Sequence, residues 1–314
     1  MHFLSAFETS HRSERKLRPA PVSRLPALVM LTHLTILIVV GLIGASNAVA
    51  GQTRYPWRAA QTTSSPQSSF EALSQQIPPP IGFQRLPVGE DSFAAWLRGL
   101  PMKPAGAPVM LHTGAKKWRQ DAHVGVVDID VGKRDLQQCA DAVMRLRAEY
   151  LWSKKRKSDI GFNYTGGGHV AFSRWARGDR PSESGKRWRR RARPDASYKS
   201  FRRYMIQIFA YAGTYSLAKE LKPVALAKLR SGDVFIKGGF PGHAVLVGDV
   251  VYNPQTGERR FLLLQSFMPA QDIHVLKNPS NANGSPWYNA AFDGDLITPE
   301  WRFKPSSLKT WPKT

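Results

Sequence analysis

The chain has only one cysteine, Cys139, among its 314 residues. A single thiol cannot form an intramolecular disulfide bond, so a disulfide-stapled scaffold is excluded. No cysteine directly follows the N-terminal apolar run, which also excludes anchoring through a lipid-modified cysteine. No internal repeat is visible, and the length fits one globular domain or at most two small ones.

Acidic residues are scarce as well. The chain has 23 Asp and Glu residues against 45 Lys and Arg residues, which gives a net charge of +22. Such a surface attracts polyanions. The excess is concentrated in two segments, KKRK at 154–157 and KRWRRRARP at 186–194. A solvated arginine-rich loop with no partner is the alternative interpretation of the second segment.

Residues 1–50 have the pattern of an export signal. A basic stretch precedes the apolar run LPALVMLTHLTILIVVGLIG, and Ala48-Val49-Ala50 provides the small residues of a signal-peptidase site. We expect cleavage after Ala50 and localisation in the periplasm or cell envelope. An uncleaved membrane anchor is the alternative, since the run has about the minimum length for a span. Export makes an anionic envelope polymer or lipid head groups the expected polyanion, and we expect no nucleic acid.

The rest of the chain is predicted to be a linker followed by one domain. Residues 51–80 are rich in Gln, Ser and Thr and end in Pro78-Pro79-Pro80, which predicts an extended linker. Residues 81–314 are expected to form a single globular domain with a basic insert near 179–196. Helices are predicted over 90–100, 135–150, 172–175 and 197–221, and strands over 108–113, 123–131, 233–237, 244–252, 260–267 and 272–276. Because helices come first and mostly antiparallel strands follow, the fold class is α+β.

Cys139 lies near the start of a predicted helix. Asp135 is a suitable N-cap, and Gln138 stands three residues later, as in a capping box. Leu136, Cys139 and Val143 repeat at helical spacing, so the cysteine falls on the buried stripe. The helix dipole lowers the pKa of a thiol at this position, as a nucleophile requires. An inert buried thiol fits the same position, because cysteine is among the most buried residue types.

His243 and Gln265, which lie much further along the chain, complete a candidate catalytic site. A turn delivers His243 to the start of the strand AVLVGDV, and strand ends beside turns often bear catalytic side chains. Gln265 lies in the apolar strand FLLLQSF, where an amide needs a hydrogen-bond partner and could orient an imidazole. Asp249 is a weaker orienting candidate. An exposed loop histidine and a glutamine bonded to nearby backbone are the alternatives, and we expect no cofactor and no metal.

Several long stretches resemble an uncharacterised family of exported bacterial proteins, domain of unknown function 4846. They are VVDIDVGKRDLQQCADAVMRLRAEYL, FRRYMIQIFAYAGTYSLAKELKPV, GDVFIKGGFPGHAVLVGDVV, QSFMPAQDIHVLKNP and SPWY. The segment GDVFI…GH also resembles NlpC/P60-like cysteine hydrolases. That resemblance implies a papain-like arrangement, with the cysteine helix packed on a mostly antiparallel sheet and His243 as the base for Cys139. The sequence departs from it at Gln138-Cys139-Ala140, where those domains have Asp-Cys-Ser.

The expected function is therefore an exported cysteine hydrolase. It would be an amidase, peptidase or acyl transferase that acts on an amide or peptide in the cell envelope, with Cys139 as nucleophile, His243 as base and Gln265 as orienting residue. The alternative is a non-catalytic envelope protein that binds an anionic polymer through its basic surface. Contact with a membrane is expected only through residues 1–50, if they are not cleaved.

Overall fold

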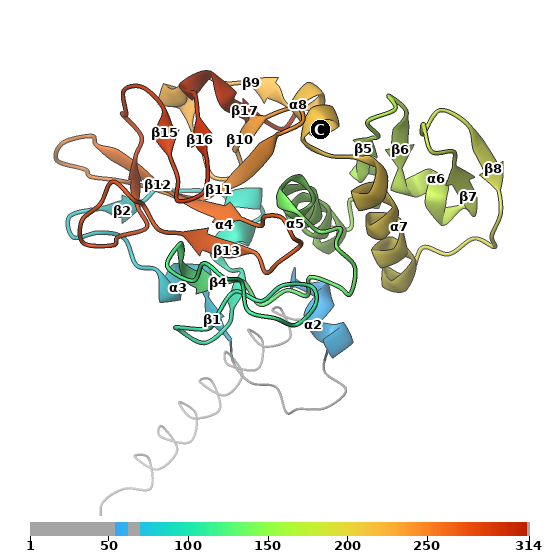
Figure 1. Cartoon of the computed structure of the whole chain (residues 1–314), viewed down its shortest axis with the longest axis horizontal. Helices are drawn as coiled ribbons and strands as arrows, with labels where there is room; N and C mark the ends of the chain where they lie inside the picture. Colours follow the sequence, from blue (N-terminus) through green and yellow to red (C-terminus); the bar gives the residue numbers. More distant parts are fainter. Residues whose placement is uncertain (1–53, 62–69, 313–314) are drawn as a thin grey trace, which may run out of the picture. The chain divides into compact units, whose positions relative to one another are not determined.

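An antiparallel sheet positions most of the candidate site (Figure 1). The computed structural model describes residues 54–61 and 70–312, so the expected export signal lies outside the described residues. Within them, the strand order of the main sheet is β4-β13-β12-β11-β10-β17-β9, with β2 beside β11 and β14 beside β12. These strands are β2 Gln84–Arg85, β4 His123–Val126, β9 Lys222–Pro223, β10 Val234–Lys237, β11 His243–Tyr252, β12 Arg259–Gln265, β13 His274–Leu276, β14 Tyr288–Asn289 and β17 Leu308–Thr310.

Helices and small strand pairs complete the described part. The helices are α2 Pro56–Gln61, α3 Leu73–Gln76, α4 Phe93–Arg98, α5 Cys139–Ser153, α6 Phe172–Ala176, α7 Tyr198–Tyr211 and α8 Thr214–Glu220, with 3-10 turns η1 Lys157–Asp159, η2 Leu226–Lys228 and η3 Pro305–Ser307. The strand pairs are β1 Glu71–Ala72 with β3 Pro101–Met102, β5 Gly161–Asn163 with β6 His169–Ala171, β7 Asp179–Pro181 with β8 Trp188–Arg190, and β15 Leu296–Ile297 with β16 Arg302–Phe303. The α+β class predicted from the sequence is confirmed.

Strand β11 separates two apolar clusters, because successive side chains of a strand point to opposite faces. Ala244 and Leu246 belong to the larger cluster, which also contains residues of α5. Val245 and Val247 belong to the second cluster, together with Phe303. Helix α5 packs against β11 and lies between the sheet and α7 (Figure 1). The first residues of α5 and β11 are therefore brought close together.

The prediction of an extended linker over residues 51–80 is wrong for the part of this range that the structure describes. Helix α2, strand β1 and helix α3 lie within residues 51–80. Tyr55 and Trp57 are each only 1% exposed. The Tyr55 hydroxyl donates to the carbonyl of Trp96 at 2.8 Å, and Trp57 Nε1 donates to the carbonyl of Asp128 at 2.8 Å. Two buried aromatic side chains thus tie this segment to the core, despite its polar composition.

Two other predicted elements differ from the structure. The helix expected over 197–221 is interrupted at Gly213, whose N–H donates to Ser216 Oγ and starts a new helix, α8. The strand expected over 108–113 forms only isolated bridges, from Met110 to Lys116 and from Leu111 to Gln271. This irregular segment leads directly into Lys117, which reaches the candidate site.

Candidate functional site

Helix α5 begins at Cys139 itself, with Gln138 as its N-cap. The backbone N–H of Gln138 donates to Asp141 Oδ2 at 3.1 Å. The predicted N-cap, Asp135, is wrong: its Oδ1 accepts from the backbone N–H of Ala270 at 2.7 Å and from Gln138 Nε2 at 3.0 Å. Asp135 therefore ties the segment before α5 to the loop after β12, which fixes the cysteine beside the end of the sheet.

The thiol of Cys139 is buried at the first position of α5 and only 7% exposed. Burial, with a smaller effect of the nearby Asp141, raises its pKa to about 11, although hydrogen bonding to the backbone of Ala244 and Ala140 acts in the opposite direction. Burial thus outweighs the helix N-terminus, and the expected lowering of the pKa is wrong. Since Ala244 directly follows His243, its bond with Cys139 places the thiol at the start of β11.

His243 is buried rather than exposed, and its ring is held in one orientation. Its Nε2 lies 2.9 Å from Gln265 Oε1, so the imidazole donates and the amide oxygen accepts. The rings of Phe267, Trp301 and Phe303 surround it, with centroids 4.8, 5.2 and 5.7 Å away. Burial lowers the pKa of His243 to about 4, so the ring is neutral at pH 7, with its lone pair on Nδ1.

Two residues that sequence reasoning missed orient the glutamine. Gln265 Nε2 donates to Glu300 Oε2 at 2.7 Å. The same carboxylate oxygen forms an ion pair with Lys117 Nζ at 2.6 Å, and the two charged side chains are only 8% and 3% exposed. Because the amide nitrogen faces a carboxylate, the amide oxygen must face His243. The sequence carries no signal for either residue, since both lie in irregular segments.

The thiol and the imidazole are neighbours along β11 but do not form a bonded pair. Ala244 faces the cluster that contains residues of α5, whereas the ring of His243 packs on Phe303 in the opposite cluster. Between these described residues, no hydrogen bond joins Cys139 to the His243 ring. The structure therefore brings His243 and Gln265 together directly, and Cys139 to the adjoining backbone.

Asp249 has a structural role instead of the predicted orienting one. It is fully buried in β11, and its two carboxylate oxygens accept from Arg85 Nε at 2.8 Å and Arg98 Nε at 2.7 Å. These bonds join β11 to β2 and α4. Asp249 is thus fully engaged away from His243.

Exposed apolar side chains border the cluster. Trp118 is 89% exposed and follows Lys117, Phe240 is 86% exposed in the turn before His243, and Met268 is 54% exposed. A neighbouring open pocket of about 560 Å³ is lined by Arg119, Lys237, Pro279, Ile297, Thr298, Pro299, Glu300, Trp301 and Arg302. Large apolar side chains that remain exposed often mark a binding surface.

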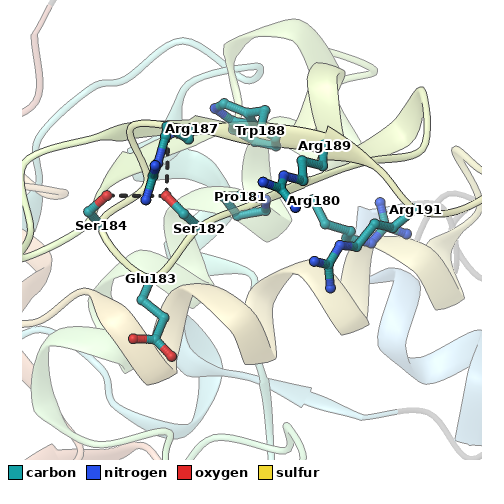
Figure 2. Close-up of a pocket in the computed structure, with 9 residues that line it drawn as sticks. All are labelled: Arg180, Pro181, Ser182, Glu183, Ser184, Arg187, Trp188, Arg189 and Arg191. Carbon is teal, nitrogen blue, oxygen red and sulfur yellow. Dashed lines mark hydrogen bonds between the residues drawn. The ribbon is translucent and has the colours of Figure 1, made fainter.

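The basic insert forms the β7–β8 hairpin, on the side of α7 away from α5 (Figure 1). A second pocket of about 830 Å³ lies on this hairpin, and four of its nine lining residues are arginines (Figure 2). In the described part of the chain, no group of three side chains suited to a metal ion occurs, and no helix has the length and apolar character needed to cross a bilayer.

Fold and site together define an α+β protein whose main antiparallel sheet ends in a buried His-Gln-Glu-Lys cluster beside a single cysteine. The chain belongs to the family described as domain of unknown function 4846, whose model matches residues 73–310. This confirms the family predicted from the sequence. No curated protein and no solved structure matches the chain. The proposed function therefore rests on the geometry of the site.

Proposed function

We propose that the protein is a cysteine hydrolase, an amidase, peptidase or acyl transferase, that acts on an amide or peptide substrate of the cell envelope. The observation that supports this most is the bond between His243 Nε2 and Gln265 Oε1. It fixes the histidine tautomer whose Nδ1 can accept a proton, in the residue that precedes Ala244, whose backbone is hydrogen-bonded to the Cys139 thiol. The papain-like arrangement suggested by the sequence is part of the same proposal.

The reaction starts from a neutral thiol and a neutral imidazole. Cys139 Sγ attacks the substrate carbonyl carbon while its proton passes to His243 Nδ1, and the carbonyl oxygen becomes an oxyanion. The backbone N–H of Cys139 lies in the first turn of α5, where it has no intrahelical acceptor, and can donate to that oxyanion. Collapse of the intermediate breaks the C–N bond, and the imidazolium returns the proton to the leaving amine. Water, or an amine acceptor, then cleaves the thioester.

Proton transfer requires the thiol and Nδ1 to come within hydrogen-bond distance. Catalytic hydrogen bonds are often long in substrate-free enzymes and shorten only in the substrate complex. Gln265 and Glu300 hold the imidazole in one orientation. When substrate binds, Cys139 Sγ therefore has to leave its hydrogen bond with the Ala244 backbone and turn toward Nδ1.

The surroundings favour a substrate with an apolar part and a negative charge. Trp118, Phe240 and Met268 offer apolar surface beside the site. Arg119, Lys237 and Arg302 line the neighbouring pocket, where they can pair with a carboxylate.

Acylation by p-nitrophenyl acetate tests the proposal, because this ester transfers an acyl group to a reactive thiol. We expect an acetyl group on Cys139, detected by mass spectrometry of the folded protein, and none in Cys139→Ser. In His243→Ala the acylation rate should fall by at least about a hundredfold, the usual contribution of a general base.

Replacement of the exposed histidine in His169→Ala serves as the matched control and should leave the rate unchanged. Thermal unfolding of each variant shows whether it is folded. Equal acylation rates in wild type and folded His243→Ala, or no adduct on Cys139, would contradict the proposal and favour a non-catalytic binding protein.

A further inference from the structure

The β7–β8 hairpin is held rigidly at its tip. Ser182 N–H donates to the carbonyl of Arg187 at 2.8 Å, and Gly168 N–H donates to the carbonyl of Ser184 at 3.0 Å. A Cβ atom on Gly168 would lie 2.1 Å from the carbonyl carbon of Gly185, so only glycine permits this contact. The turn through Gly168 thus supports the hairpin, whose geometry is already set before any ligand binds.

One face of the extended segment 187–191, which contains β8, carries a row of arginines. Arg187, Arg189 and Arg191 are at alternate positions of an extended segment, so they share a face and are spaced by about 6.6 Å. All three line the pocket of about 830 Å³, together with Arg180 of β7. In Figure 2, Arg180, Arg189 and Arg191 lie close together under the strand, and Glu183, the one carboxylate among the lining residues, points away from them.

The opposite face of the hairpin is neutralised. Arg190 Nε lies 3.6 Å from Asp179 Oδ1, and Arg174 Nε lies 3.3 Å from Asp179 Oδ2. The guanidinium of Arg174 also covers the ring of Trp188, at 4.7 Å from its centroid. The two faces therefore differ. Asp179 pairs with Arg190 and Arg174 on this one, whereas among the described residues no ion pair joins Arg187, Arg189 or Arg191 to a carboxylate.

The arginines of this pocket repel one another within the hairpin. Arg180 and Arg189 are directly opposite each other in the hairpin register, and like charges at such positions are destabilising. Arg180 is fixed over the ring of Trp175, 3.8 Å from its centroid, and donates to the carbonyl of Trp175 at 2.9 Å. Burial and the nearby Arg203 lower the pKa of Arg180, against the opposing charges of Asp179 and Asp195. A preformed array of like charges with an internal cost is typical of a ligand site.

We propose that this arginine row binds a linear polymer of phosphate groups. Guanidinium groups bind phosphate oxygens in pairs, and a row with regular spacing fits a repeated anion better than a single one. Nucleic acid is disfavoured, because Trp188 is the single aromatic ring that lines this pocket and Arg174 already covers one of its faces, whereas successive bases need several stacking rings. A lipid surface is disfavoured because the arginines line a pocket instead of projecting from an apolar face.

The test is titration of the full chain with long-chain inorganic polyphosphate, followed by calorimetry at several salt concentrations. We expect binding that weakens as salt increases, and much weaker binding of inorganic phosphate. Arg187→Ser/Arg189→Ser/Arg191→Ser should raise the Kd at least about tenfold and lower the slope of log K against log salt by about two. Since Arg180 and Arg189 repel each other, the variant should unfold at the same or a higher temperature, and the single Arg189→Ser variant provides a second, milder test.

Two control variants distinguish binding at the hairpin from nonspecific attraction to the positive charge of the whole protein. Lys133→Ser/Lys222→Ser/Lys304→Ser removes three exposed charges elsewhere and should change the Kd by less than about threefold. Arg190→Ser removes a charge from the neutralised face of the same strand and should also have little effect. An equal loss in the Lys triple variant would overturn the proposal. Tighter binding of anionic vesicles or single-stranded DNA than of polyphosphate, with the same dependence on the arginines, would overturn it as well.

Discussion

At the scale of single residues, the orientation of the His243 ring depends on the Glu300 carboxylate, which it reaches through the Gln265 amide. Glu300 accepts from the Gln265 amide, whose oxygen accepts from the imidazole. The negative charge of Glu300 also raises the pKa of His243, against the larger effect of burial. Glu300 is thus a positioning residue, since it acts on His243 through Gln265 and through its field.

Glu300→Gln should lower the pKa of His243 below its value of about 4, because the favourable carboxylate charge is removed while Lys117 remains. NMR titration of the ring protons measures this shift directly. Arg119→Gln is a useful control, since it changes a charge near Glu300 without touching Gln265. An unchanged His243 pKa in Glu300→Gln would show that the carboxylate serves only to neutralise Lys117.

The thiol of Cys139 should react slowly with iodoacetamide at pH 7. Its pKa is raised to about 11, so the reactive thiolate is rarer than in free cysteine, and the rate should increase with pH up to that value. The check is the alkylation rate compared with free cysteine, with the urea-unfolded chain as a control that should react like free cysteine. Faster alkylation of the folded protein at pH 7 would indicate a preformed thiolate–imidazolium pair and contradict the neutral mechanism.

Cys139, His243 and Gln265 could be selected from the sequence because each is chemically unusual in its own regular segment. Lys117 and Glu300 could not be selected, although they complete the cluster. They are 183 positions apart and meet through irregular loops, where neither periodicity nor a motif constrains the contact. The raised pKa of Cys139 could not be predicted from the sequence either, because the direction of the shift depends on how deeply the start of the helix is buried.

At the scale of elements, helix α2 shows how a few aromatic residues can dominate a polar segment. Ser, Gln and Thr suggest a linker, but Tyr55 and Trp57 are buried against Trp96. The helix expected over 197–221 fails for a different reason: apolar periodicity continues across Gly213, where the backbone is extended. In the first case long-range packing, which composition does not encode, decides the structure; in the second the extended backbone of Gly213 and its bond to Ser216 do.

Trp57→Ala should lower the free energy of unfolding by about 3–5 kcal/mol, the usual cost of removing a buried Trp side chain. The loss includes the hydrogen bond from Trp57 Nε1 to the Asp128 carbonyl. Urea unfolding measures the change. Ile81→Ala is the control, since Ile81 is fully exposed, and it should have almost no effect. Equal stability of Trp57→Ala and wild type would restore the linker interpretation of this segment.

At the scale of the whole molecule, the α+β class follows from the order of helices and strands, and the family follows from the stretches that resemble it. The strand order does not follow from the sequence. Strand β4 pairs with β13, and β17 pairs with both β10 and β9, so partners far apart in the chain build the two edges of the sheet. Such pairings are set by the packing of complete faces, which a local pattern cannot specify.

The stability of the folded unit should depend on pH through two groups with opposite signs, the buried His243 and the half-buried Glu220. The pKa of His243 is lowered by burial to about 4, below its ordinary value, so unfolding takes up a proton as the pH falls from about 6.5 to 4. His243 thus favours the folded state above pH 6.5, and this contribution, about 3 kcal/mol, is lost toward pH 4. The pKa of Glu220 is raised by burial to about 7, so the folded state holds its proton longer, and stability falls as the pH rises from about 4.5 to 7.

Urea unfolding of His243→Gln and Glu220→Gln between pH 4 and 8 separates the two effects. Relative to wild type, His243→Gln should be most destabilising at pH 7 and progressively less so toward pH 4. Glu220→Gln should show the reverse, with its largest relative stabilisation at pH 8, because the variant no longer carries a partly desolvated carboxylate, which accepts from the Asn163 N–H. Subtracting the wild-type free energy of unfolding from that of each variant at the same pH removes the contributions of all other titrating groups. Parallel pH profiles for wild type and both variants would mean that neither group keeps its buried, shifted pKa in solution, and the neutral His243 that the proposed reaction requires would lose its physical basis.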